Sequence, residues 1–139
     1  MIIYTGGTFD LLHAGHMNFF RQIKELFPSC ELVVSLNTDE FVESYKGKKP
    51  IFNYQEREQQ LLWCGHVDKI IPNVGGADSK PTILDIKPTI IAIGQDWLSR
   101  DYCKQMQFDA QWLTDRGISL IYIPHTDGIS ATEIKRRLK

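Results

Sequence analysis

The chain has 139 residues and a formal net charge of −1, with 42% hydrophobic and 24% charged residues. These values are typical of one soluble globular domain, which we expect to cover residues 1–139. The balanced charge gives no overall electrostatic reason to bind nucleic acid, and no apolar stretch approaches the roughly 20 residues that span a bilayer. The three cysteines form no CxxC pattern, which favours reduced thiols in a cytoplasmic protein over a zinc site or a disulfide framework.

Short apolar runs alternate with amphipathic segments along the whole chain. In chain order we expect a strand at 1–5, a helix at 16–27, a strand at 31–36, a short helix at 39–45, a helix at 53–64, a strand at 67–71, a helix at 78–86, a strand at 89–93, a broken helical region at 97–116, a strand at 119–123 and a helix at 130–138. The alternation predicts an α/β fold with a parallel sheet, because parallel strands need helical crossovers. Asn53 with Glu56, and Ser130 with Glu133, have the spacing of capping boxes at two helix starts.

The most informative segment is a glycine-rich turn, GGTFDLLHAGH at residues 6–16, between the first strand and the first helix. Such a turn lets backbone N–H groups approach an anion, and the helix N-terminus adds positive partial charge. His13 and His16 lie three residues apart around Gly15, where imidazoles can donate hydrogen bonds to phosphate oxygens. The segment therefore predicts phosphate chemistry on a nucleotide.

The turn resembles the HxGH signature of the nucleotidylyltransferase superfamily, and it is most similar to the cytidylyltransferase branch that acts on glycerol 3-phosphate. The resemblance implies a Rossmann-like three-layer domain: a central parallel sheet of about five strands with helices on both faces, and a site at the carboxyl ends of the strands. It also implies two catalytic histidines, His13 and His16. The nucleotide-binding residues that it implies here are Gly7, Thr8, Phe9, His13, Gly15 and His16.

A basic loop, KGKKP at residues 46–50, follows the short helix. By resemblance, Lys46 contacts the acceptor phosphate and Lys48 the triphosphate, and both take part in catalysis. Two phosphorylated molecules must approach despite their like charge, so ammonium groups between them are needed. A solvated basic loop would show the same residues. Arg57, in the following helix, matches another arginine of the family and would brace the loop.

Two later segments are expected at the same edge of the sheet. Residues 93–97 resemble the GDDW motif of the family, with Gln95 in place of an aspartate, and Asp96 would accept a hydrogen bond from the exocyclic amine of cytosine. Residues 126–133 resemble the motif RTEGISTT, and a well-capped helix is the alternative. The nucleotide contacts implied around this motif are His125, Thr126, Gly128, Ile129, Ser130 and Thr132.

The chain departs from the family pattern at several positions. His125 replaces an arginine, which predicts weaker or pH-dependent phosphate binding unless Arg100 compensates. Gly65 replaces an arginine of the segment associated with the family's dimer contact, so a homodimer is left open. Lys80 is the best candidate for a second acceptor-binding lysine. Asp10 is a third acceptor-side candidate, with structural bonding in the turn as the alternative.

Taken together, these residues predict an enzyme that transfers CMP from CTP to a small phosphorylated acceptor, glycerol 3-phosphate by default, and releases pyrophosphate. The attacking phosphate oxygen is already anionic, so catalysis needs positioning and charge stabilisation rather than a general base. Mg²⁺ is expected on the triphosphate, without protein side chains as ligands. Two other interpretations stay open: an adenylyltransferase that uses ATP and a sugar phosphate, and a noncatalytic nucleotide-binding module.

Overall fold

The computed structural model describes residues 1–74, 80–94, 109–124 and 128–138. Its elements are β1 (Ile2–Gly7), α1 (Ala14–Leu26), β2 (Glu31–Asn37), α2 (Asp39–Lys46), α3 (Tyr54–Trp63), β3 (Lys69–Asn73), α4 (Lys80–Ile86), β4 (Ile90–Gly94), α6 (Ala110–Asp115), β5 (Ser119–Ile123) and α7 (Ala131–Arg137). All five predicted strands are confirmed, with ends within two residues of those expected. Most of the predicted helical region at 97–116 lies outside the described residues.

The five strands form one parallel sheet in the order β3-β2-β1-β4-β5, which confirms the predicted α/β, Rossmann-like fold. The strand order reverses between β1 and β4. Open α/β sheets bind ligands at such a reversal, outside the carboxyl ends of the strands. β1 pairs with β2 at six positions but with β4 at only two, Ile3 with Ile90 and Tyr4 with Ile91, so the sheet is least continuous at the reversal.

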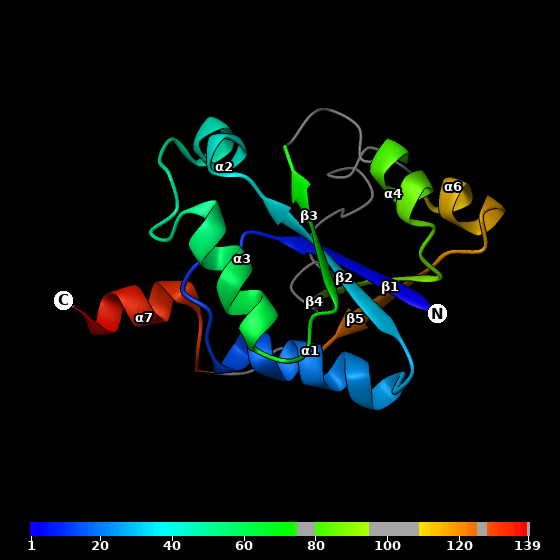
Figure 1. The fold of residues 1–139 in the computed structure, drawn as a ribbon, viewed down its shortest axis with the longest axis horizontal. Coiled ribbons are helices and arrows are strands. Elements are labelled where there is room, and N and C mark those ends of the chain that lie inside the picture. The colour runs from blue at the N-terminus through cyan, green and yellow to red at the C-terminus, as the bar shows by residue number, and fades with distance from the viewer. Residues whose placement is uncertain (75–79, 95–108, 125–127, 139) are drawn as a thin grey trace.

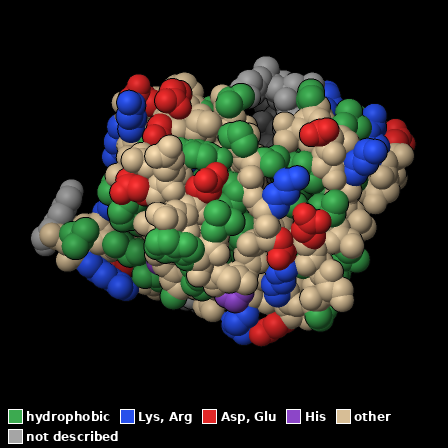
Figure 2. Space-filling view, viewed as in Figure 1, with side chains coloured by type: hydrophobic (Ala, Val, Ile, Leu, Met, Phe, Trp, Pro, Cys, Tyr) green, Lys and Arg blue, Asp and Glu red, His purple; other side chains and the backbone are tan. Residues whose placement is uncertain are grey.

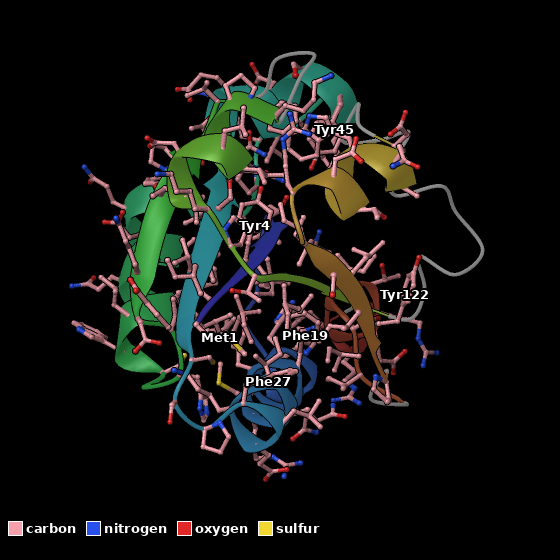
Figure 3. The ribbon with its side chains drawn as sticks, turned by 90° about the vertical axis from the view of Figure 1, so that its right-hand side faces the viewer. Met1, Tyr4, Phe19, Phe27, Tyr45 and Tyr122 are labelled. Carbon is pink, nitrogen blue, oxygen red and sulfur yellow. The ribbon has the colours of Figure 1, made fainter. Side chains whose placement is uncertain are left out.

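Helices cover both faces of the sheet, as the sequence predicts. Neighbouring side chains of β1 belong to different cores: Ile3 packs with side chains of α1 and α3, and Tyr4 with those of α4 and α6. Figure 1 shows these two pairs of helices on opposite sides of the strands. In Figure 3, Tyr4 lies on the side of α4 and α6, whereas Phe19 and Phe27 extend from α1 on the other side. The sheet is therefore the middle layer of three.

The two predicted helix caps have different outcomes. Asn53 and Glu56 form a complete capping box, with the Glu56 N–H donating to Asn53 Oδ1 at 2.9 Å and the Asn53 N–H donating to Glu56 Oε1 at 3.0 Å. Ser130 caps α7 as predicted, because its Oγ accepts from the Glu133 N–H at 3.0 Å. The predicted return bond from Glu133 is wrong: its carboxylate binds the Arg136 guanidinium at 2.7 and 2.8 Å, which is a stronger, charged partner.

The face of the molecule that Figure 2 shows, which includes α3, carries exposed apolar side chains. Leu62 and Trp63, at the end of this helix, are 47% and 76% exposed. Cys30 and Cys64 are free thiols, and Cys103 lies outside the described residues. Within the described ranges, no helix combines the length and the apolar character that a membrane crossing requires.

Candidate active site

The turn between β1 and α1 is tight and strained. Phe9 and Leu11 have positive φ angles of 50° and 53°, a conformation that side-chain-bearing residues adopt rarely and that costs on the order of 1 kcal/mol each. A Cβ on Gly7 would lie 2.9 Å from the Phe9 ring, so glycine allows the chain to fold back at the end of the strand. Strain of this kind persists only where the surroundings hold it, and it gathers at functional sites.

His13 and His16 are held as a stacked pair at the start of α1. The Gly15 N–H donates to His13 Nδ1 at 3.0 Å, and the His13 N–H donates to His16 Nδ1 at 3.2 Å. The ring centroids are 3.9 Å apart. Because both Nδ1 atoms accept hydrogen bonds, each neutral ring carries its hydrogen on Nε2. Both imidazoles are thus in the tautomer whose Nε2–H can donate to a phosphate oxygen.

The surroundings keep His16 uncharged. Burial, reinforced by the neighbouring His13, lowers the pKa of His16 from 6.5 to about 4. The Phe9 ring meets the His16 ring edge-on at 5.4 Å and supplies part of the apolar surroundings. At neutral pH this imidazole therefore donates a hydrogen bond without adding positive charge, and the charge that a triphosphate requires must come from other side chains.

Gly15 brings the two ends of the chain together. A Cβ at this position would lie 2.8 Å from His13 Cε1 and 3.4 Å from Ile129 Cγ2. Only glycine therefore fits between the histidine ring and the segment that precedes α7. The structure thus places the HxGH turn directly against the Gly128–Ser130 segment, as expected for two parts of one site.

A network of uncharged polar side chains lies at the carboxyl ends of the first three strands. Asn37 donates through Nδ2 to Thr8 Oγ1 at 3.0 Å and accepts at Oδ1 from Asn73 Nδ2 at 2.9 Å. The hydroxyl groups of Thr8 and Tyr45 are 3.1 Å apart. Of these residues, only Thr8 was predicted from the sequence to belong to the site. The available signal was an asparagine closing each of two apolar strands, at the edge where ligands bind.

Arg57 is buried and binds several segments at the carboxyl ends of the strands. Its side chain is 0% exposed and donates to the carbonyl oxygens of Thr8 and Asn37, both at 2.8 Å, and of Phe52 at 3.0 Å. It also forms an ion pair with Asp39 at 2.7 Å. The predicted brace therefore connects four segments: the turn after β1, the end of β2, the start of α2 and the loop before α3.

Asp10 connects the same loop to the HxGH turn. Its carboxylate accepts from the Ile51 N–H at 2.7 Å and from the Phe52 N–H at 3.0 Å. This bonding is structural, but it reaches across to the loop before α3, whereas the alternative predicted from the sequence was bonding within the turn. A direct contact between Asp10 and the acceptor stays a prediction.

A cavity of about 420 Å³ opens between the HxGH turn, α2, the basic loop and α7. Its lining residues are Thr8, Asp10, Val42, Lys46, Lys48, Lys49, Pro50, Ile51, Lys135 and Leu138. Among the residues that the structure describes, none of the four lysines has a carboxylate partner. We call this space the lysine cavity. Of its lysines, Lys46 and Lys48 were predicted, whereas Lys49 and Lys135 were not.

The remaining predicted residues are spread over the structure. Lys80 begins α4 and does not line the lysine cavity. Gly128 has a φ of 78°, and its carbonyl oxygen accepts from Arg137 at 3.2 Å. Thr132 is exposed on α7. The predicted contacts Asp96, His125 and Thr126 lie outside the described residues.

The parallel sheet reverses its strand order after β1, and the turn at that point carries two imidazole donors and lines the lysine cavity through Thr8 and Asp10. This arrangement defines the class: a nucleotidyltransferase. Comparison with known proteins gives the family. The chain belongs to the cytidylyltransferase-like family, whose family model matches residues 4–137. The resemblance seen in the sequence is thereby confirmed.

Two relatives align with nearly the whole chain. The glycerol-3-phosphate cytidylyltransferase of Staphylococcus aureus is 34% identical over 136 residues, which cover 98% of this chain and 93% of the relative. The enzyme of the same name from Bacillus subtilis is 35% identical, with 98% and 95% covered. The FAD synthase of Thermococcus sibiricus is 39% identical over 94 residues, which cover 68% of this chain and 62% of the relative.

Among solved structures, the lipopolysaccharide core biosynthesis protein of Thermoplasma volcanium has a TM-score of 0.68 at 28% identity, covering 91% of this chain and 96% of that protein. The names of the sequence relatives confirm a nucleotidyltransferase and leave open which substrates this chain uses.

Proposed function

We propose that this protein transfers CMP from CTP to a small phosphorylated acceptor, with glycerol 3-phosphate as the first candidate. An oxygen of the acceptor phosphate attacks the α-phosphorus of CTP, the bond to the β-phosphate oxygen breaks, and pyrophosphate leaves. No proton transfer is needed, because the attacking oxygen is already anionic. The observation that carries this proposal is that one turn, residues 6–16, holds two imidazole donors and also lines a cavity with four lysines, through Thr8 and Asp10.

The histidines would act on the phosphates at the reacting centre. Their Nε2–H groups are fixed in direction because each Nδ1 is bound to the backbone. Donors fixed in this way stabilise the charge that develops on the α-phosphate without reorganising during the reaction, and losing one typically lowers turnover by about 10²- to 10³-fold.

The basic loop would supply the positive charge. Lys46 is the last residue of α2, and Gly47 then adopts a φ of 79° that ends the helix and turns the chain into the loop. This turn places Lys46, Lys48 and Lys49 around one cavity. Their ammonium groups would offset the repulsion between the acceptor phosphate and the nucleotide, with Lys46 on the acceptor and Lys48 on the triphosphate.

The chain's residues fit a Mg²⁺ that is held chiefly by the nucleotide. In the described ranges, no group of three or more histidine, cysteine, aspartate or glutamate side chains could hold a metal ion. The one carboxylate of the lysine cavity, Asp10, already accepts two backbone hydrogen bonds. Phosphate oxygens and water are the ligands that Mg²⁺ prefers, and the ion would neutralise charge on the triphosphate.

A second candidate is transfer from ATP, because FAD synthases match two-thirds of the chain. A pyrophosphate-release screen tests both. CTP and ATP would each be combined with glycerol 3-phosphate, phosphocholine, phosphoethanolamine and a sugar phosphate. We expect the highest kcat/KM with CTP and glycerol 3-phosphate. A higher kcat/KM with ATP would contradict the nucleotide assignment, and no release with any pair would favour a noncatalytic nucleotide-binding module.

A further inference from the structure

Helix α7 ends with three consecutive basic residues, Lys135, Arg136 and Arg137, which have different partners. Arg136 pairs with Glu133 one turn earlier, and Arg137 binds the same glutamate at 3.4 Å and the Gly128 carbonyl oxygen at 3.2 Å. Lys135 lies about 100° around the helix from Arg136. It lines the lysine cavity together with Leu138, three residues further on. One face of α7 is thus neutralised internally, and the other brings a lysine to the cavity.

The surroundings of Lys135 differ from those of the two arginines. Lys135 is half-buried, whereas Arg136 and Arg137 are exposed. Among the described residues, the ammonium group of Lys135 has no hydrogen bond or ion pair, and its backbone carbonyl oxygen accepts from the Leu138 N–H. A solvated surface lysine would be more exposed and would not converge with three other lysines on one hollow.

The charge balance of the cavity calls for an anion. Among the described lining residues, four lysines face one carboxylate, Asp10, whose two oxygens are bound to the Ile51 and Phe52 N–H groups. Cations gathered in a hollow raise the local concentration of anions and repel one another until one binds. A phosphate dianion would relieve that repulsion.

We infer that Lys135 binds the phosphate of the acceptor, so that the C-terminal helix forms part of the acceptor subsite. This inference rests on the proposed function and adds a residue from α7 to it. The apolar walls of the cavity, Val42, Pro50 and Leu138, suit the organic part of a small phosphomonoester. A polyphosphate chain has no apolar part to place against them. The ligand class is therefore a phosphomonoester with a small organic body.

Calorimetric titration of glycerol 3-phosphate tests this assignment, with a non-transferable CTP analogue present at saturation. The proteins compared are wild type, Lys135→Met, Lys135→Arg and Arg136→Gln. Arg136→Gln is the matched control, because it removes one positive charge from the same helix outside the cavity. Inorganic pyrophosphate is titrated in parallel without the analogue, and melting temperatures verify that each variant is folded.

We expect Lys135→Met to weaken glycerol 3-phosphate binding by about tenfold or more, the loss typical of one charged hydrogen bond. Lys135→Arg keeps the positive charge at the cavity and should bind within about threefold of wild type. Arg136→Gln removes a charge outside the cavity and should bind within about twofold. Pyrophosphate binding should change little in any variant.

Three results would overturn the inference: unchanged binding in Lys135→Met, an equal loss in Arg136→Gln, or a loss confined to pyrophosphate. A wild type that binds no glycerol 3-phosphate would overturn it too. The proposed transfer reaction is tested separately, by pyrophosphate release. It can therefore fail while Lys135→Met still binds glycerol 3-phosphate more weakly than Arg136→Gln does.

Discussion

At the scale of single residues, the histidine pair joins helix capping to chemistry. Protonation of His16 Nδ1 would turn an acceptor into a donor facing the His13 N–H, and protonation of His13 Nδ1 would do the same facing Gly15. For His16 this agrees with the low pKa, so the folded state favours its neutral form. The same bonds that start α1 also fix the hydrogens on Nε2, where phosphate can accept them.

This coupling predicts a pH dependence of stability. The pKa of His16 falls from 6.5 to about 4 on folding, so between these values the unfolded chain binds a proton that the folded chain does not. The stability contributed by neutral His16 is fully present above pH 6.5 and is lost as the pH falls toward 4. The loss amounts to at most about 3 kcal/mol.

Chemical denaturation of wild type and His16→Gln between pH 4 and pH 8 gives the free energy of unfolding of each protein. The effect is the difference between their two slopes against pH. Groups away from the histidine pair titrate equally in both proteins, so the comparison isolates His16 together with its coupling to His13. Identical slopes below pH 6.5 would show that the imidazole is not kept neutral by the fold.

Gly15 gives a second prediction at this scale. In Gly15→Ala the new methyl group would push the His13 ring, 2.8 Å away, out of its stack, while alanine favours the helix by about 1 kcal/mol over glycine. We expect turnover to fall by about tenfold or more, because one donor is misplaced. The melting temperature should change little, because the lost His13 cap costs about as much as the alanine contributes. Unchanged turnover would mean that the stacked geometry is not required for catalysis.

At the scale of elements, the local patterns were sufficient for the secondary structure. Apolar runs predicted every strand of the sheet, and Asn53 with Glu56 predicted the start of α3. His13 shows the limit of that approach: helix α1 begins at Ala14, two residues earlier than its apolar spacing indicates, because a histidine caps it. Histidine is not among the usual capping residues, so sequence patterns gave no signal.

The contacts that join elements could not be predicted in the same way. Asn37 and Asn73 are neighbours only because β2 and β3 pair in parallel register, and Lys135 reaches the lysine cavity only through the placement of α7. In the sequence, Lys135 is simply one of three basic residues at the end of a helix, a position that the helix dipole favours anyway. Tertiary geometry decides which of the three meets a ligand.

The contacts of Arg57, which hold several elements together, give a prediction about stability. In Arg57→Met, the carbonyl oxygens that it binds and the Asp39 carboxylate would lose their partner in a buried place, so we expect a loss of roughly 3–5 kcal/mol in the free energy of unfolding. The control is Arg21→Met, which breaks an exposed pair with Glu25 and should cost less than about 1 kcal/mol. Urea denaturation of both variants gives the comparison, and equal losses would contradict the role assigned to Arg57.

At the scale of the whole molecule, the strand order explains why the two ends of the chain share one site. β1 is the central strand, so the turn that follows it lies where the strand order reverses. The basic loop after α2 and the last helix, α7, lie toward the edge to which β1 and β2 run (Figure 1). Histidines near the N-terminus and a lysine near the C-terminus thus border one region, which suits an enzyme that must hold two phosphorylated substrates.

The central claim is that the histidine pair and the lysine cavity together perform nucleotidyl transfer. Its most direct test is pyrophosphate release from CTP and the best acceptor by wild type, His16→Ala and Lys48→Met, with Arg136→Gln as the control of equal charge loss. We predict that the histidine variant loses about 10²-fold or more in kcat while remaining folded, and that the Lys48 variant loses comparably in kcat/KM. The control should keep wild-type rates. Near-normal turnover in folded His16→Ala would contradict the claim.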